Sequence, residues 1–172
     1  RLGDREVVGF CSNDYLGFGS EPVSLPRMEA GATASRLVAG DLPVHRELEA
    51  RLAAWVGTED AVLYPSGYQA NVSALCVLIE RQDRVHSDAL NHASLIDGLR
   101  LARSRPRILH HLCPPEVKAD ADTGFDWWIC EGAYSMEGDG PTIDDLDRHL
   151  ERGGCLYFDE AHTLGLHERG RG

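Results

Sequence analysis

Two ionisable residues follow a hydrophobic run near the end of the sequence. The run Cys155–Phe158 is typical of a buried strand, and Asp159 and His162 come just after it. A carboxylate at the end of a buried strand is costly unless a cation or hydrogen-bond donors lie beside it. Ligands of open α/β sheets bind at the carboxyl ends of the strands. Asp159 and His162 are therefore candidates for one half of a ligand site.

Three segments upstream also place polar or glycine-flanked residues where a strand ends or a helix begins. Gly67 and Tyr68 open a predicted helix, whose first amide groups can bind an anion such as phosphate. His92 stands at the next helix start, and Glu131 ends a hydrophobic run that Ser135 and three glycines follow. Each position alone has an ordinary explanation as a turn or a cap. Together, at one edge of a sheet, they favour a ligand site.

This combination of side chains suits pyridoxal 5'-phosphate (PLP). A helix start would bind the phosphate, and a carboxylate would keep the pyridine nitrogen protonated. Histidine and serine would hydrogen-bond the phenolic oxygen. The protonated ring could then act as an electron sink.

The elements that must position these residues alternate along the chain. Hydrophobic spacing predicts helices over 44–56, 67–80 and 93–103 and from 142, and strands over 61–64, 84–86, 107–110, 127–130 and 155–158. The alternation predicts an α/β fold, a three-layer, mostly parallel sheet flanked by helices. The polar, turn-rich residues 113–125 are predicted to form a surface loop.

Composition excludes some classes of function. The 172 residues have a net charge of −11, which argues against nonspecific binding to nucleic acid or anionic membranes. No apolar run approaches the roughly 20 residues of a membrane span, and the start lacks a signal-peptide core. The five cysteines form no CxxC pair. We therefore expect a cytoplasmic protein.

Several motifs occur in one order over nearly the whole chain. They are Ser12–Gly17, Ala34–Gly40, Ser66–Asn71, Asn91–Ser94, Glu131–Gly132 and Asp159–His162. In these motifs the chain resembles the α-oxoamine synthases, fold-type-I PLP enzymes that condense an amino acid with an acyl-CoA. Within the family it is most similar to the branch that joins L-alanine to pimeloyl-CoA, with decarboxylation, in biotin synthesis. The branches that form 5-aminolevulinate, 2-amino-3-ketobutyrate or 3-ketosphinganine stay open.

The resemblance implies roles around the cofactor ring. His92 would stack on the pyridine ring, and Asp159 would pair with its nitrogen. His162 and Ser135 would contact the phenolic oxygen. His92, Asp159 and His162 are thus the expected catalytic residues.

The resemblance also implies contacts beyond the ring. Gly67 and Tyr68 would lie near the phosphate, and Glu131 would line the same pocket. Asn13 would reach the amino-acid substrate. The family completes its site at a homodimer interface, so a homodimer is expected.

The same resemblance also concerns the domain organisation of the chain and its Schiff-base lysine. Residues 1–40 would contribute to the active site and the dimer interface, and residues 41–172 would form part of the PLP-binding large domain. The family's Schiff-base lysine lies beyond the matching motifs, and the one lysine printed, Lys118, falls in an unmatched loop. We expect that the sequence is part of a longer enzyme; a noncatalytic subunit of the same fold that lacks the lysine is the alternative.

Two further interpretations are weaker. Asp159–His162 also matches the motif of a helicase class, but the phosphate-binding loop that such a helicase needs is missing. His110, His111 and Cys113 could begin a metal site, but they lack a fourth ligand at a suitable spacing. We therefore expect no metal.

Overall fold

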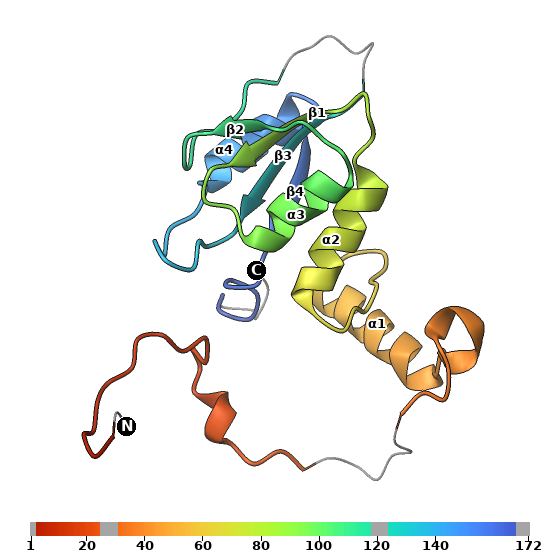
Figure 1. Cartoon of the computed structure of the whole chain (residues 1–172), viewed down its shortest axis with the longest axis vertical. Helices are drawn as coiled ribbons and strands as arrows, with labels where there is room; N and C mark the ends of the chain where they lie inside the picture. The colour runs from red at the N-terminus through yellow and green to blue at the C-terminus, as the bar shows by residue number, and fades with distance from the viewer. Residues whose placement is uncertain (1–2, 25–30, 118–123, 168–172) are drawn as a thin grey trace. The chain divides into compact units, whose positions relative to one another are not determined.

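The computed structural model describes residues 3–24, 31–117 and 124–167 (Figure 1). Contacts divide the chain into two compact units, Arg1–Leu42 and Pro43–Gly172.

The described residues of the first unit, 3–24 and 31–42, contain two short helical turns. A 3-10 helix, η1, spans Phe18–Ser20, and a π-helical turn, η2, spans Arg36–Gly40. The Ser35 side chain caps η2 by accepting a hydrogen bond from the Leu37 N–H at 3.3 Å. Arg36 forms an ion pair with Asp41 at 2.9 Å, so this turn is held locally.

The second unit is built on a parallel sheet of four strands in the order β2-β1-β3-β4. The strands are β1 (Arg84–Asp88), β2 (Arg107–Leu109), β3 (Asp126–Glu131) and β4 (Cys155–Asp159). The helices are α1 (Pro43–Val56), α2 (Gly67–Leu78), α3 (Ala93–Leu101) and α4 (Ile143–Glu151). All pairings among the described strands are parallel, which confirms the predicted fold class.

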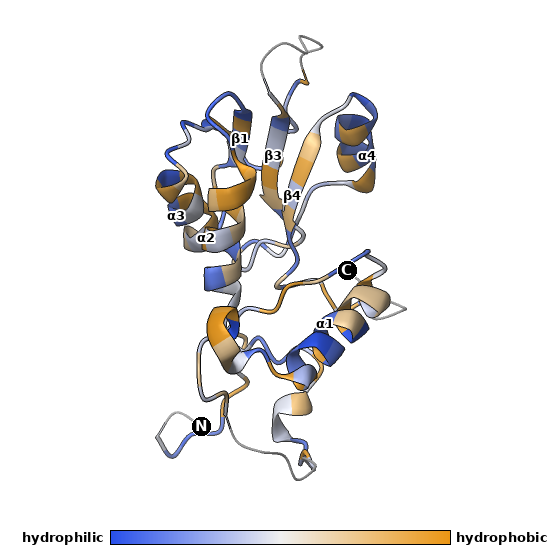
Figure 2. Ribbon diagram, turned by 90° about the vertical axis from the view of Figure 1, so that its right-hand side faces the viewer, coloured by the Kyte–Doolittle hydropathy of each residue, from blue (hydrophilic) through white to orange (hydrophobic). Residues whose placement is uncertain are grey.

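Helices cover both faces of this sheet. Ile129 of β3 packs with Leu75 of α2 and Leu95 of α3 on one face. Its neighbour Trp128 faces the other way and packs in a second cluster that includes Leu146 of α4. Figure 2 shows α2 and α3 on one side of the strands and α4 on the other. The alternation along β3 therefore produces the three predicted layers.

Two helix ends have residues that suit their positions. The Thr142 Oγ1 atom accepts a hydrogen bond from the Asp145 N–H at 3.2 Å and caps α4. Gly57, with φ of 91°, ends α1, and its N–H donates to the Ala53 carbonyl. Both positions need a residue that suits a helix end, and both were recognisable in the sequence.

The predicted strand over residues 61–64 is wrong. These residues form no strand, and the Leu63 N–H donates to Glu49 Oε1 of α1 at 2.8 Å. A strand needs a neighbour for its N–H and C=O groups, and no described strand pairs with this segment. A hydrophobic pattern does not specify that neighbour.

Two further predictions concern residues outside the sheet: a surface loop over 113–125 and the absence of a membrane-spanning helix. Residues 113–117 and 124–125 form neither helix nor strand, and 118–123, including Lys118, lie outside the described residues. Among the described helices, none has both the length and the apolar character that crossing a membrane requires.

Candidate active site

A cavity of about 530 Å³ lies at the carboxyl ends of β3 and β4. Glu131 and Asp159 are paired in register at these two strand ends. The predicted site residues that line it are Gly67, Tyr68, His92, Glu131, Asp159 and His162. We call this the edge cavity. It brings together residues from the starts of α2 and α3 and from the segment after β4.

Asp159 presents a half-buried carboxylate to the edge cavity. Its Oδ2 atom accepts a hydrogen bond from Asn71 Nδ2 at 2.7 Å, and its Oδ1 atom accepts one from the Ala161 N–H at 2.9 Å. Both donors are neutral. They orient the carboxylate but do not cancel its charge, so Asp159 is suited to bind a cationic group.

Glu131 is more deeply buried than Asp159, with 5% of its surface exposed. Burial raises the pKa of Glu131; the His92 N–H, which donates to Glu131 Oε1, opposes this rise, and the nearby Asp159 charge adds to it. Two adjacent carboxyl groups thus share the edge cavity. Because burial favours the neutral form of Glu131, a cation there would be stabilised mainly by Asp159.

Two histidines contribute imidazole rings to the same cavity. His92 caps α3, and its Nδ1 atom accepts a hydrogen bond from the Ser94 N–H at 3.2 Å. The Ser94 Oγ atom lies 2.7 Å from the same nitrogen. His162 is half-buried within the turn that the Thr163 N–H closes by donating to the Glu160 carbonyl.

The start of α2 forms the anion-binding part of the cavity wall. Ser66 caps the helix by accepting a hydrogen bond from the Gln69 N–H at 3.2 Å. A Cβ atom built on Gly67 would meet nothing within 4 Å, so the first amide groups are approachable. The Tyr68 hydroxyl donates to Asp97 Oδ2 on α3 at 2.7 Å, which holds the ring beside this helix start.

Two predicted site residues do not line the edge cavity. Ser135 is exposed in the turn after β3, and the residues around the cavity do not include it. Asn13 is exposed in the first unit. The roles of Ser135 and Asn13 stay predictions.

Asn71 is a site residue that sequence reasoning missed. It is 9% exposed, lines the edge cavity and contacts Asp159, Ser94 and Tyr157 through its amide. A signal was present, because Asn71 precedes the buried Leu75 and Ile79 at helical spacing. A polar residue on the buried face of a helix needs hydrogen-bond partners in the core.

His111, one of the three residues considered for a metal site, instead lies between two carboxyl groups. The Nδ1 atom of His111 lies 3.0 Å from Asp88 Oδ1, and its Nε2 atom lies 3.0 Å from Asp139 Oδ1. Partial burial lowers the pKa of His111, but the hydrogen bonds to both carboxylates outweigh it and raise the pKa overall. Among the described residues, no group of three or more His, Cys, Asp or Glu side chains could hold a metal ion.

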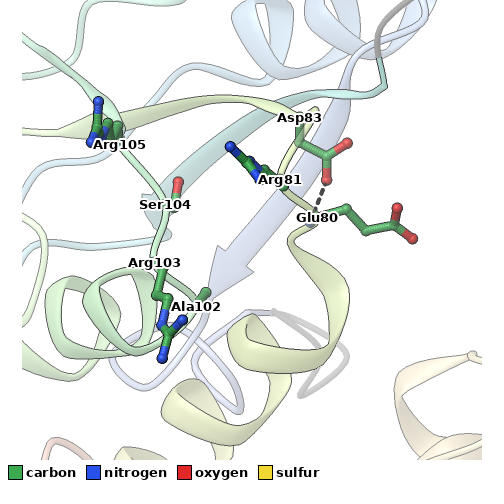
Figure 3. A pocket seen from close by; sticks show the side chains of 7 residues that line it. All are labelled: Glu80, Arg81, Asp83, Ala102, Arg103, Ser104 and Arg105. Carbon is green, nitrogen blue, oxygen red and sulfur yellow. Dashed lines mark hydrogen bonds between the residues drawn. The ribbon is translucent and has the colours of Figure 1, made fainter.

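A second cavity, of about 550 Å³, lies beyond the carboxyl ends of α2 and α3 (Figure 3). Its walls include Arg81, Arg103 and Arg105 together with the acidic Glu80 and Asp83. Cations near helix carboxyl ends complement the helix dipole, which accounts for these arginines structurally. The edge cavity is therefore the better candidate for a functional site.

Comparison with known proteins agrees with this choice. The model of the family "Aminotransferase class I and II" matches residues 5–170. The 8-amino-7-oxononanoate synthase of Anaeromyxobacter sp. (strain K) is 42% identical over 180 residues, which cover 96% of this chain and 44% of that protein. The chain thus spans less than half the length of this relative.

Solved structures show the same fold. Serine palmitoyltransferase of Sphingomonas wittichii has a TM-score of 0.70 and 30% identity, covering 78% of this chain and 35% of that one. A structure of SPT with PLP has a TM-score of 0.73 and 27% identity, covering 83% of this chain and 37% of that one. These proteins confirm the resemblance to the α-oxoamine synthases. The chain belongs to the aminotransferase class I and II family.

Proposed function

We propose that the protein carrying this chain is a PLP-dependent acyltransferase. It condenses L-alanine with pimeloyl-CoA, with decarboxylation, and forms 8-amino-7-oxononanoate for biotin synthesis. The observation that supports this most is the Asp159 carboxyl group, oriented by two neutral donors in a cavity that also contains a helix start. The 42% identity to 8-amino-7-oxononanoate synthase supports the choice of substrates.

The residues of the edge cavity fit PLP. The approachable amide groups at Gly67 suit its phosphate, and the Asp159 carboxylate suits its protonated pyridine nitrogen. The SPT structure with PLP supports the same cofactor. When bound, PLP supplies an electron sink for a carbanion at the substrate.

Each residue then has a defined task. The Asp159 carboxylate would keep the proton on the pyridine nitrogen, while Glu131 fixes the start of α3 by accepting a hydrogen bond from the His92 N–H. The His92 ring, which lines the edge cavity, would cover one face of the cofactor and exclude water. His162 would hydrogen-bond the phenolic oxygen, and Ser135 and Asn13, which do not line the edge cavity, would contact the phenolic oxygen and the amino acid as the family resemblance implies.

Titration with PLP tests the cofactor. We expect a visible absorption band that borohydride removes, and we expect Asp159→Asn to weaken PLP binding by about tenfold or more, equivalent to roughly 1.4 kcal/mol. Asp147→Asn is the matched control, because it removes one exposed carboxylate from α4. Absence of PLP binding by the unmodified protein, or equal binding by both variants, contradicts the proposal.

Release of CoA identifies the substrates. Alanine with pimeloyl-CoA should give faster release than glycine or serine with the same acyl-CoA. Faster turnover with serine and palmitoyl-CoA would place the protein in another branch. Binding of PLP without CoA release from any pair would indicate a noncatalytic subunit.

The proposal includes a homodimer in the cytoplasm, with residues 1–40 at the active site and the interface. The first unit exposes large apolar side chains, among them Val8 at 82%, Phe10 at 94% and Leu37 at 95%. Apolar groups so exposed suit an interface. All five cysteines are free, as in a reducing compartment. Sedimentation equilibrium should give twice the monomer mass, and a monomer at all concentrations would contradict the dimer.

A further inference from the structure

The side-chain amide of Asn71 has a single orientation that satisfies its neighbours. A carboxylate only accepts hydrogen bonds, so the Nδ2 group must face Asp159 Oδ2, at 2.7 Å. The Oδ1 atom then accepts from the Tyr157 hydroxyl at 2.9 Å. Burial, followed by the Asp159 charge, raises the pKa of Tyr157 to about 12, so this hydroxyl stays protonated and donates.

The second proton of the Asn71 amide continues the network. It is donated to Ser94 Oγ at 2.8 Å, so the Ser94 hydroxyl proton is left for another acceptor. The nearest acceptor is His92 Nδ1, 2.7 Å from Ser94 Oγ. Asn71 thus has a continuous path of hydrogen bonds to the histidine at the edge cavity.

Two donors of Ser94 converge on one nitrogen of His92. The backbone N–H donates to Nδ1 at 3.2 Å, and the hydroxyl lies at 2.7 Å. If Nδ1 were protonated, its N–H and the Ser94 N–H would point at each other, two donors with no acceptor between them. The neutral ring must therefore have its proton on Nε2.

We propose that Asn71 is a positioning residue that couples the two groups of the edge cavity: its amide orients Asp159 directly and, through Ser94, sets the tautomer of His92. The importance of this coupling for catalysis rests on the proposed function. In that function Asp159 would meet the ring nitrogen and His92 would cover the ring face, so one amide would align both side chains before the cofactor binds. Helix α2 would thereby position three parts of the site: the Asp159 carboxylate, the His92 ring and the amide groups of its own first turn, which suit the phosphate.

Nuclear magnetic resonance of the chain labelled with ¹⁵N-histidine, without cofactor, tests the tautomer directly. Long-range proton–nitrogen correlation distinguishes a protonated ring nitrogen from an unprotonated one, and loss of a signal in His92→Gln assigns His92. We expect a single Nε2–H form at a pH where the ring is neutral. Ser94→Ala and Asn71→Ala should both shift His92 toward a mixture of tautomers.

Gln69→Ala is the matched control, because Gln69 is exposed on the same helix. Its spectrum should leave the His92 signal unchanged. If Asn71→Ala fails to fold, Tyr157→Phe removes the hydroxyl that anchors the Asn71 carbonyl and should move the His92 signal in the same direction. An Nδ1–H form in the unmodified chain, or a His92 signal unmoved by Ser94→Ala and by Asn71→Ala or Tyr157→Phe, overturns the proposal.

Affinity for PLP provides a second measurement. Loss of the Asn71 amide should weaken PLP binding by about three- to tenfold, because the Asp159 carboxylate loses one of its two donors. Failure of the unmodified protein to bind PLP would contradict the proposed function. The resonance experiment would still decide whether Asn71 couples Asp159 and His92. The proposed function and the role of Asn71 can therefore be contradicted separately.

Discussion

Asp159 and Glu131 occupy equivalent ends of neighbouring strands, yet their surroundings differ. Asp159 accepts two hydrogen bonds from neutral donors, whereas Glu131 is buried with a single backbone donor, the His92 N–H. Burial raises the pKa of Glu131 and so favours its neutral form. Residue environment, rather than residue type, thus makes Asp159 the better partner for a cation.

Replacement of His111 should change how stability depends on pH. The pKa of His111 is raised above its ordinary value of 6.5, so its protonated form stabilises the fold. This contribution is complete below pH 6.5 and is lost as the pH rises through the raised pKa. His111→Gln should therefore lower the free energy of unfolding at acidic pH and flatten its decline above pH 6.5.

Urea unfolding at several pH values between 5.5 and 8.5 measures this effect, to within about 10–15% of each free energy. His110→Gln is the control, since His110 is the exposed neighbour. The His111 contribution is absent if both variants follow the pH profile of the unmodified chain.

At the scale of elements, α2 and α3 pack closely because Gly98 lacks a side chain. A Cβ atom at Gly98 would lie 2.9 Å from Leu75 Cδ1 and 3.2 Å from the Asn71 carbonyl oxygen. The glycine therefore allows α3 to approach the part of α2 that contains Asn71. Glycine in a helix has a structural purpose here, despite its poor helix propensity.

Gly98→Ala should destabilise the protein. Alanine improves helix propensity by about 1 kcal/mol, but overpacking costs about 1–3 kcal/mol. Because the contact with the Asn71 carbonyl oxygen is with backbone, we expect overpacking to dominate and a net loss of about 1 kcal/mol. Thermal unfolding measures the change.

Gly67→Ala is the matched control for stability, because a Cβ atom there meets nothing within 4 Å. It should unfold at or above the temperature of the unmodified chain. A Gly98→Ala variant that behaves in the same way would show that α2 and α3 adjust without cost.

At the scale of the molecule, the two hydrophobic clusters depend on one sheet. Ile129 belongs to the cluster beneath α2 and α3, while Leu109 belongs to the cluster on the α4 face. The strands that bear them, β3 and β2, are both paired with β1. Loss of packing on either face should therefore weaken the same cooperative unit.

Ile129→Val should reduce the free energy of unfolding by about 0.5–1.5 kcal/mol, and Leu109→Ala by about 2–5 kcal/mol. Urea unfolding, followed by circular dichroism and by tryptophan fluorescence, should show one common transition for each variant. The double variant should lose the sum of the two, to within about 0.5 kcal/mol. Separate transitions by the two probes would show that the faces unfold independently.

Much of this protein is determined by the sequence itself. Helix caps such as Thr142 and stops such as Gly57 act through the nearest turns of backbone, so they are readable locally. The polar residues after hydrophobic runs were readable for the same reason, and Gly67, His92, Glu131, Asp159 and His162 all line the edge cavity.

Tertiary structure decided the rest, because partners distant in sequence are not encoded in a local pattern. Residues 61–64 look like a strand but pair with no described strand, and Leu63 bonds to Glu49 instead. Asn71 looks like one more helix residue until folding brings Asp159, 88 residues away, to 2.7 Å from its amide. The residue types at the site come from the sequence, but the hydrogen bonds that orient them exist only once α2, α3 and β4 have packed together.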